Sequence, residues 1–132
     1  MARSMDPRRV VQRYYEEAVN GGNVALLDEI MAPDFVGHSL AAHSFGREDV
    51  RAALVQSRAA YPDGSVEIED QVAEGDRVAS RWRFRWSEGG RHWELAGIQI
   101  HRVLDGRLSE VWEVKDRPRP SSAGHPEAGP TA

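Results

Sequence analysis

The spacing of apolar residues along the chain changes from a helical period to a strand period near residue 65. Before this point apolar residues recur every three or four positions, and after it they alternate with polar residues. A helix buries the first pattern along one stripe, whereas a strand buries the second on one face. Helices followed by a run of strands predict an α+β domain.

Three helices are predicted in the first half of the chain. Residues 6–23 begin with an aspartate cap and a proline at the first helical position, and two glycines end the pattern. Residues 23–33 carry a short apolar stripe that a proline stops, and residues 46–64 repeat the helical spacing up to a Pro-Asp-Gly turn. A loop that holds His38 and His43 precedes the third helix.

The second half is predicted to form an antiparallel meander. Residues 77–86 alternate most strictly, with tryptophan and phenylalanine on one side and arginine on the other. The following strands are connected through the turns SEGG and LDG, which carry glycine where a hairpin needs a positive φ. With three helices at its open side, this curved sheet is expected to form a cone-like α+β barrel that encloses a pocket.

Composition narrows the class of protein. A chain of 132 residues with 40% hydrophobic content suits one domain, and a net charge of −4 offers no general attraction for nucleic acid or an anionic membrane. Cysteine is absent, which excludes disulfides and thiolate sites. The N-terminal stretch lacks a signal-peptide pattern and no window is apolar enough for a membrane span, so a cytoplasmic protein is expected.

The folded domain is expected to comprise residues 1–116. Residues 117–132 are rich in proline, serine, glycine and alanine and show no periodicity. Such a segment has too little apolar surface to offset the entropy of ordering it. We therefore expect a disordered C-terminal tail.

The terminal hairpin GIQIHRVLDGRLSEVWEVKD, residues 97–116, combines an apolar strand, an arginine, an Asp-Gly turn and a Glu-x-Trp strand. Together with APDFVGH at residues 32–38, and with the order helix, helix, strand, helix and four strands, it resembles the SnoaL-like polyketide cyclases of the nuclear transport factor 2-like superfamily. The resemblance covers residues 10–116. It implies the cone-shaped fold expected above.

The resemblance also implies three catalytic residues. In ring-closing members a carboxylic residue on the last strand acts as the general acid/base, and an imidazole on the preceding strand binds or polarises the substrate carbonyl. Aligning the Asp-Gly turns puts Glu113 at the carboxylate position and Gln99 at the imidazole position. Gln99 can donate a hydrogen bond to an oxyanion but cannot carry a proton at neutral pH. His38 is similar to a histidine found in many members and is expected to line the pocket.

The direction in which Glu113 faces is open. A carboxyl group in an apolar pocket can remove a proton α to a carbonyl. However, Glu113 directly follows Trp112, and if the tryptophan faces the core, alternation turns the glutamate to solvent or to a dimer partner. A one-residue bulge would reverse both.

Aromatic side chains are the expected walls of the pocket. Tyr14, Trp82, Trp86 and Trp93 could stack on a planar substrate, with Trp86 and Trp93 near the rim, although aromatic residues on one strand face are often plain core. His101, on the same strand as Gln99, is a further expected substrate contact.

Metal ions, cofactors and nucleic acid are not expected. The spacing of His38 and His43 could ligate a metal, but no carboxylate or cysteine completes a recognisable ligand pattern. Four arginines share one strand face: Arg77, Arg81, Arg83 and Arg85. Three glutamates lie on neighbouring strands: Glu67, Glu69 and Glu94. Cross-strand ion pairs therefore explain the arginines better than a nucleic-acid track does.

The expected function is a small cofactor-free enzyme that acts on a hydrophobic, carbonyl-bearing metabolite of polyketide type. Its reaction would be an aldol-type cyclisation, an isomerisation or an elimination. One alternative is an epoxide-opening or hydrating enzyme of the same superfamily, for which Asp70 and Arg102 are candidate residues. The other is a non-catalytic module for ligand binding or dimerisation, which would have a filled or shallow pocket.

A homodimer is also expected. Ile98 and Ile100 lie on either side of Gln99, so they face outward if Gln99 faces the pocket. An apolar patch on the outer sheet face needs a partner, and superfamily members commonly pair through the sheet.

Overall fold

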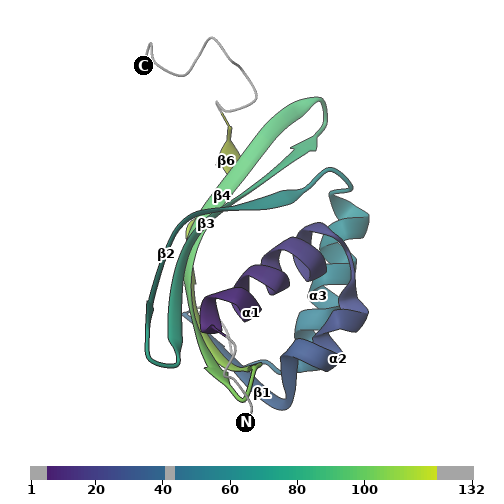
Figure 1. Cartoon of the computed structure of the whole chain (residues 1–132). Coiled ribbons are helices and arrows are strands. Elements are labelled where there is room, and N and C mark those ends of the chain that lie inside the picture. The colour runs from purple at the N-terminus through teal and green to yellow at the C-terminus, as the bar shows by residue number, and fades with distance from the viewer. Residues whose placement is uncertain (1–5, 41–43, 122–132) are drawn as a thin grey trace.

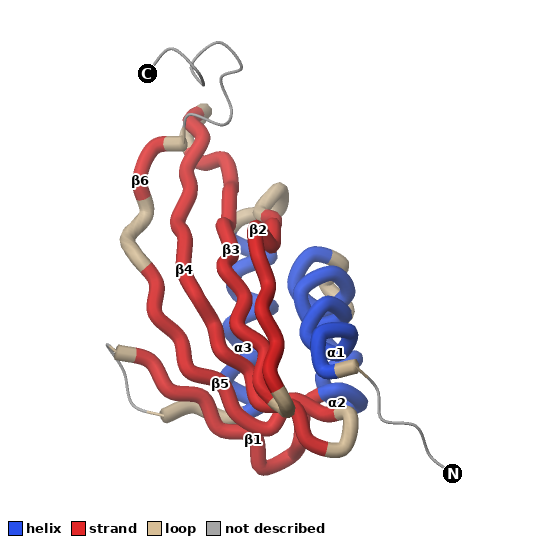
Figure 2. The backbone as a smooth tube through the Cα atoms, turned by 60° about the vertical axis from the view of Figure 1, so that its left-hand side comes forward, coloured by secondary structure: helices blue, strands red, loops and turns tan. Residues whose placement is uncertain are grey.

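The computed structural model describes residues 6–40 and 44–121 as helices packed on the concave side of a strongly curved sheet (Figures 1 and 2). The order of helices and strands agrees with the predicted α+β class and cone-like shape. No helix within these residues is long and apolar enough to cross a membrane.

The helical half of the chain contains a π-helix that the sequence pattern did not predict. The helical elements are α1 (Pro7–Arg13), the π-helix η1 (Tyr14–Asn20), the 3₁₀ turn η2 (Val24–Leu26), α2 (Leu27–Ile30) and α3 (Arg47–Ala60). The side chain of Asp6 accepts a hydrogen bond from the Arg8 amide at 3.0 Å and caps α1, as the sequence predicts. The first predicted helix is therefore one continuous segment that widens after its first half.

The strands form one six-stranded sheet with the order β1-β5-β4-β3-β2, and β6 pairs with β4. The strands are β1 (Met31–Ser39), β2 (Ser65–Glu74), β3 (Arg77–Glu88), β4 (Arg91–Leu104), β5 (Arg107–Lys115) and β6 (Arg119–Pro120). β1 runs parallel to β5, whereas the other neighbours are antiparallel. The antiparallel meander predicted for the second half of the chain is therefore confirmed over β2 to β5, and the parallel β1 makes the whole sheet mixed and open between β1 and β2.

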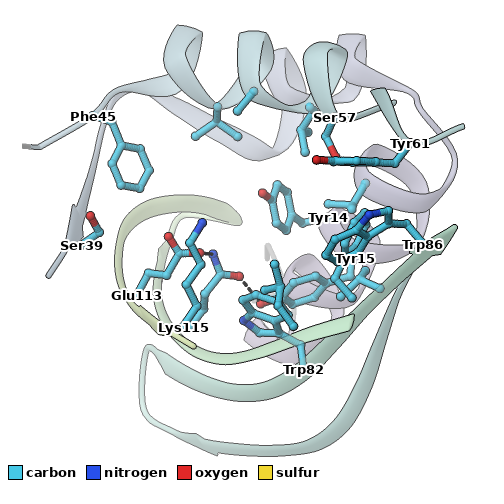
Figure 3. Close-up of a pocket in the computed structure, with 18 of the residues that line it drawn as sticks. Tyr14, Tyr15, Ser39, Phe45, Ser57, Tyr61, Trp82, Trp86, Glu113 and Lys115 are labelled. Atoms are coloured by element: carbon cyan, nitrogen blue, oxygen red, sulfur yellow. Dashed lines mark hydrogen bonds between the residues drawn. The ribbon is translucent and has the colours of Figure 1, made fainter. Parts of the chain in front are cut away.

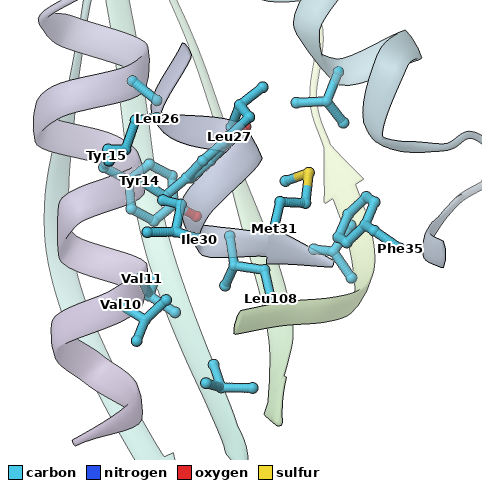
Figure 4. Packing of buried hydrophobic residues seen from close by; sticks show 14 of the residues in the cluster. Val10, Val11, Tyr14, Tyr15, Leu26, Leu27, Ile30, Met31, Phe35 and Leu108 are labelled. Atoms are coloured by element: carbon cyan, nitrogen blue, oxygen red, sulfur yellow. The ribbon is translucent and has the colours of Figure 1, made fainter. Parts of the chain in front are cut away.

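The core fills the closed end of the cone (Figure 4). The helices contribute Val10, Val11, Leu27 and Ile30, which pack against the start of β1 and the start of β5 at Leu108. Packing at this end leaves the other end of the concave face without a complete apolar filling, and the cavity described below lies there.

His101 lies in this core and is almost completely buried. Its ring packs against Tyr14 and Tyr15, at centroid distances of 5.6 and 6.0 Å. Burial disfavours the charged imidazolium and lowers the pKa of His101 to about 3. The imidazole is therefore neutral in the folded protein near neutral pH.

The ordered domain continues beyond the predicted boundary at Asp116. β6 pairs with β4, and Ser121 is buried at the end of the described chain. The Ser121 amide donates to the His92 carbonyl at 2.8 Å, and its hydroxyl donates to Glu94 at 3.0 Å. The first five residues of the predicted tail, 117–121, therefore belong to the ordered domain. They order because β4 supplies hydrogen-bond partners that local composition does not reveal. Residues 122–132 lie outside the described residues.

These contacts predict different effects for two truncations. Ending the chain after Asp116 removes β6 and the hydrogen bonds of Ser121, and should lower the free energy of unfolding by about 1–3 kcal/mol, at roughly 1 kcal/mol per bond. Ending it after Ser121 keeps these contacts and serves as the matched control. Urea unfolding measures both; equal midpoints for the two truncated chains would contradict a stabilising role for β6.

Burial of neutral His101 also predicts a pH dependence of stability. Because the unfolded imidazole binds a proton near its ordinary pKa of 6.5 and the folded one only near 3, stability is lost as the pH falls through this window. The slope should approach about 1.4 kcal/mol per pH unit for this one group. Urea unfolding of His101→Phe and of the unsubstituted protein between pH 7.5 and 5 should give a difference that changes with pH. Parallel curves would contradict it.

Candidate active site

Four polar side chains lie in one row across the concave face of the sheet. Ser80 of β3 pairs with Gln99 of β4, Gln99 pairs with Glu113 of β5, and Glu113 pairs with Ser39 of β1. Residues directly opposite one another on neighbouring strands send their side chains to the same face. The register of four strands therefore gathers these polar groups in one place.

Hydrogen bonds connect this row to the first helical segment. The Tyr15 hydroxyl donates to Gln99 Oε1 at 2.5 Å, and Gln99 Nε2 donates to Glu113 Oε2 at 3.0 Å (Figure 3). The two partners fix the orientation of the amide, because the carboxylate only accepts and the amide oxygen cannot donate. Gln99 thus holds one carboxylate oxygen of Glu113 and leaves the other oxygen without a protein partner among the described residues.

Glu113 lines a cavity of about 570 Å³ on the concave face. Its neighbour Trp112 lies on the convex face and stacks against His38, with ring centroids 5.6 Å apart and planes at 19°. The bulge between β4 and β5 lies nearer to their connecting turn, between Arg102 and Val103 of β4. It does not interrupt the pairing of Gln99 with Glu113. Of the two orientations left open by the sequence, the structure has Glu113 inside and Trp112 outside.

The walls of the cavity are mostly apolar (Figure 3). Six of the aromatic side chains that line it are Tyr14, Phe45, Tyr61, Trp82, Phe84 and Trp86. On the sheet side the polar lining residues include Glu113, Gln99 and Ser39, and α3 adds Asp49 and Ser57. A ligand in this cavity would therefore meet a few polar groups on a mostly apolar surface.

The π-helix places two consecutive tyrosines against the sheet. Tyr14 and Tyr15 are both buried and both line the cavity, and their rings contact each other edge to face at 5.2 Å. Burial raises the pKa of the Tyr14 hydroxyl, and the negative charge of Glu113 raises it further. Burial likewise raises the pKa of Tyr15, with smaller contributions from Tyr14 and Glu113. Both phenols are therefore protonated hydrogen-bond donors near neutral pH.

Three of the aromatic residues expected to contact a substrate line the cavity, namely Tyr14, Trp82 and Trp86. Trp93 does not: it pairs with Trp86 near the hairpin tip, and the Arg91 guanidinium lies 5.4 Å from the centre of its ring. His101 is also absent from the lining, because Tyr14 and Tyr15 lie over it. The expectation that Trp93 and His101 contact a substrate in this cavity is corrected.

The predicted position of His38 in the pocket is wrong. His38 belongs to β1 rather than to a loop, and its parallel pairing with Trp112 puts its side chain on the convex face. There its Nε2 lies 2.7 Å from Glu110 Oε2. The cavity side of β1 is instead occupied by Gly37 and Ser39, which alternate with His38.

The residues considered for other chemistries do not meet in the cavity. Asp70 lies beside a separate groove between the first helix and β2, and Arg102 pairs with Asp76 at 3.1 Å. Within residues 6–40 and 44–121, no group of three or more histidine, aspartate or glutamate side chains is placed to hold a metal ion. His43, the proposed second member of a histidine pair, lies outside the described residues.

The arginine face of β3 forms cross-strand ion pairs, as the sequence predicts. Arg81 and Arg83 each pair with Glu69, at 2.9 and 3.0 Å, and Arg85 pairs with Glu67 at 2.9 Å. Glu94 is a further partner of Arg83, at 2.9 Å. Arg77 instead lies over the ring of Trp112 on the convex face.

Among the lining residues that were missed from the sequence are Tyr15, Phe45 and Lys115. Tyr15 was overlooked because the predicted stripe of Val10, Tyr14 and Ala18 left out the neighbouring pair Val11 and Tyr15, which is also four residues apart and buried. Phe45 covers Gly37 so closely that a Cβ on that glycine would lie 2.2 Å from its ring. Lys115 has a signal in the sequence: it is two residues after Glu113 on a strand, so both share one face.

Comparison with known proteins identifies the family of the chain. A family model described as SnoaL-like polyketide cyclase matches residues 9–120. A loop truncation variant of IdmH is 31% identical, with a TM-score of 0.77 over 84% of this chain and 93% of that one. For wild-type IdmH from Streptomyces antibioticus, the identity is 28% and the TM-score 0.76, over 85% and 93% of the two chains.

TsrD from Streptomyces laurentii is 27% identical, with a TM-score of 0.71 over 86% of this chain and 92% of that one. No protein with a curated description matches the chain. Since the family model spans most of the sequence, and the fold agrees with that of the solved structures, the chain belongs to the SnoaL-like polyketide cyclase family.

Proposed function

We propose that the protein is a small cofactor-free enzyme that acts on a hydrophobic, carbonyl-bearing metabolite by general acid/base catalysis, with Glu113 as the catalytic residue. One observation carries the proposal: the Glu113 carboxylate, held on one oxygen by Gln99, lies in the polar part of an apolar cavity. The family membership of the chain supports a substrate of polyketide type.

The reaction begins with proton transfer to Glu113. The carboxylate oxygen that Gln99 does not hold takes a proton from the carbon next to the substrate carbonyl, and the C–H electron pair moves onto the carbonyl oxygen as an enolate. The enolate carbon then attacks an electrophilic carbon, shifts the double bond or expels a leaving group. Glu113 returns the proton to the product or to the leaving group, so no net proton is consumed by the enzyme.

Neutral donors are available for the enolate oxygen. The Gln99 amide has a second N–H besides the one that holds Glu113, and the Tyr14 hydroxyl lines the cavity as a protonated phenol. Preorganised donors of this kind stabilise the charge that develops in the transition state. They replace His38, whose place on the convex face removes it from the proposed mechanism.

Neither alternative gains support from the geometry. Epoxide opening or hydration was linked to Asp70 and Arg102, and neither lines this cavity. A non-catalytic dimerisation module was expected to have a filled or shallow pocket, whereas this cavity measures about 570 Å³ and has a carboxylate in its wall.

Deuterium exchange into a simple ketone tests the role of Glu113 before any natural substrate is identified. The protein should accelerate exchange at the carbon next to the carbonyl of 1-tetralone, measured by NMR in D₂O. Glu113→Gln keeps the size and hydrogen bonding of the side chain but removes the base, and should lower this rate by about a hundredfold. Glu110→Gln is the matched control, because Glu110 lies on the same strand and contacts His38 on the convex face. Equal rates for the protein and Glu113→Gln would refute the proposal.

The convex face supports a proposed homodimer. Ile98, Ile100 and Val114 lie side by side there, with exposed fractions of 47%, 37% and 53%. The ion-paired arginines and glutamates of β2 and β3 border this patch, and a mixed set of charges can complement itself across a twofold axis. We expect a second copy of the chain to cover the patch.

Light scattering at micromolar concentration should therefore give the mass of a dimer. Ile98→Arg should shift it to the mass of a monomer, because the charge would be buried without a partner. Val55→Arg is the control, because Val55 is similarly exposed but lies on α3. A monomer mass for the unsubstituted protein would refute the proposed dimer.

A further inference from the structure

Lys115 is the single lysine among the 17 basic residues of the chain, and it lines the cavity. Figure 3 shows its amine pointing into the cavity alongside the Glu113 carboxylate. Within the described part of the chain, its ammonium group takes part in no hydrogen bond or ion pair that meets ordinary distance limits. A cation thus faces the cavity without being used to hold the fold together.

The register of the sheet places Lys115 there. Trp82, Gly97 and Lys115 form the row next to the polar row of Gln99 and Glu113. A Cβ at residue 97 would lie 2.6 Å from Cζ2 of Trp82 and 3.0 Å from Cβ of Lys115, so only glycine leaves room for both side chains. The aliphatic part of Lys115 can therefore lie along the apolar wall while its ammonium stays near the opening.

No carboxylate among the described residues, Glu113 included, lies within ion-pair distance of this ammonium. Asp49 also lines the cavity, but its carboxylate accepts the Gly46 amide at 2.8 Å and caps α3. Asp116 accepts the Ala96 amide at 2.8 Å and pairs with Arg119. Lys115 is therefore available to an anionic group of a ligand.

We propose that Lys115 binds a carboxylate of the substrate, so that the substrate is a carbonyl-bearing acid rather than a neutral compound. The inference rests on the proposed function, which supplies the carbonyl and the role of Glu113. Glu113 and Lys115 are two residues apart on β5 and both line the cavity, so a carboxylate bound at Lys115 lies close to the carbon that loses its proton. The enolate oxygen, bonded next to that carbon, has Gln99 and Tyr14 as nearer donors.

Such an arrangement also decides the orientation of the substrate. The apolar body would pack against the aromatic walls, and the carboxylate would point to the opening, where water completes its solvation. Without Lys115, an acidic substrate would meet Glu113 with no compensating positive charge among the described lining residues. Selectivity for an acid therefore depends on this one side chain.

A binding comparison with 2-naphthoate and 2-naphthamide tests the inference. The two compounds share a ring system and differ in charge, and isothermal titration calorimetry measures both affinities. The protein should bind the acid about twofold to fivefold more tightly than the amide, the range that a solvent-exposed ion pair supports. Lys115→Met should abolish the preference, while Lys115→Arg should keep it. Arg107→Met, which removes an exposed charge elsewhere on β5, should leave it unchanged.

Equal binding of acid and amide, failure of the acid to bind, or a preference that survives in Lys115→Met would overturn the inference. These outcomes are separate from the proposed function, because ketone exchange on 1-tetralone requires no carboxylate. Exchange that depends on Glu113 without an acid preference would leave the enzyme assignment standing and remove the role of Lys115. An acid preference that depends on Lys115 in a protein without exchange activity would refute the catalytic proposal and retain an acid-binding site.

Discussion

The register of β4 between β3 and β5 decides which side chains reach the cavity. β4 pairs with both neighbours over most of its length, and each pair of opposed residues shares one face. A slip of β4 by one residue would turn Gln99 to the convex face and bring Ile98 inside, and the same slip of β5 would exchange the faces of Glu113 and Trp112. The polar row, the lysine row and the exposed apolar patch are therefore consequences of one alignment.

Polar groups inside an apolar cavity are tolerated only where they are hydrogen-bonded. Gln99 satisfies this condition with both ends of its amide, since it accepts from Tyr15 and donates to Glu113. Tyr15 belongs to the π-helical segment, and π-helical turns often occur at functional sites. The hydrogen bonds from Tyr15 to Gln99 and from Gln99 to Glu113 thus connect the first helical segment with the sheet.

The sequence predicts those features of the fold that depend on local pattern. Strict alternation on β3 places Trp82 inside and Arg81 outside, as the structure has them. The predictions that were wrong concern segments whose structure depends on strands far away in the sequence. β1 contains a proline and a glycine without clear alternation, so only its parallel pairing with β5 reveals that His38 faces outward. Likewise, the composition of residues 117–121 indicates a tail, whereas β4 provides the edge on which they order.

The chemistry of Gln99 limits where a proton can go in the polar row. An amide neither gains nor loses a proton near neutral pH, and burial keeps Tyr14 and Tyr15 protonated. In the proposed reaction, a proton taken from the substrate would therefore have one acceptor in the polar row, Glu113, which would also have to give it back. Three reactions satisfy this condition. In a cyclisation the carbon proton ends on the new hydroxyl, in an isomerisation it returns to another carbon, and in an elimination Glu113 protonates the leaving hydroxyl. A reaction that requires a separate acid and base at the same carbon does not satisfy the condition.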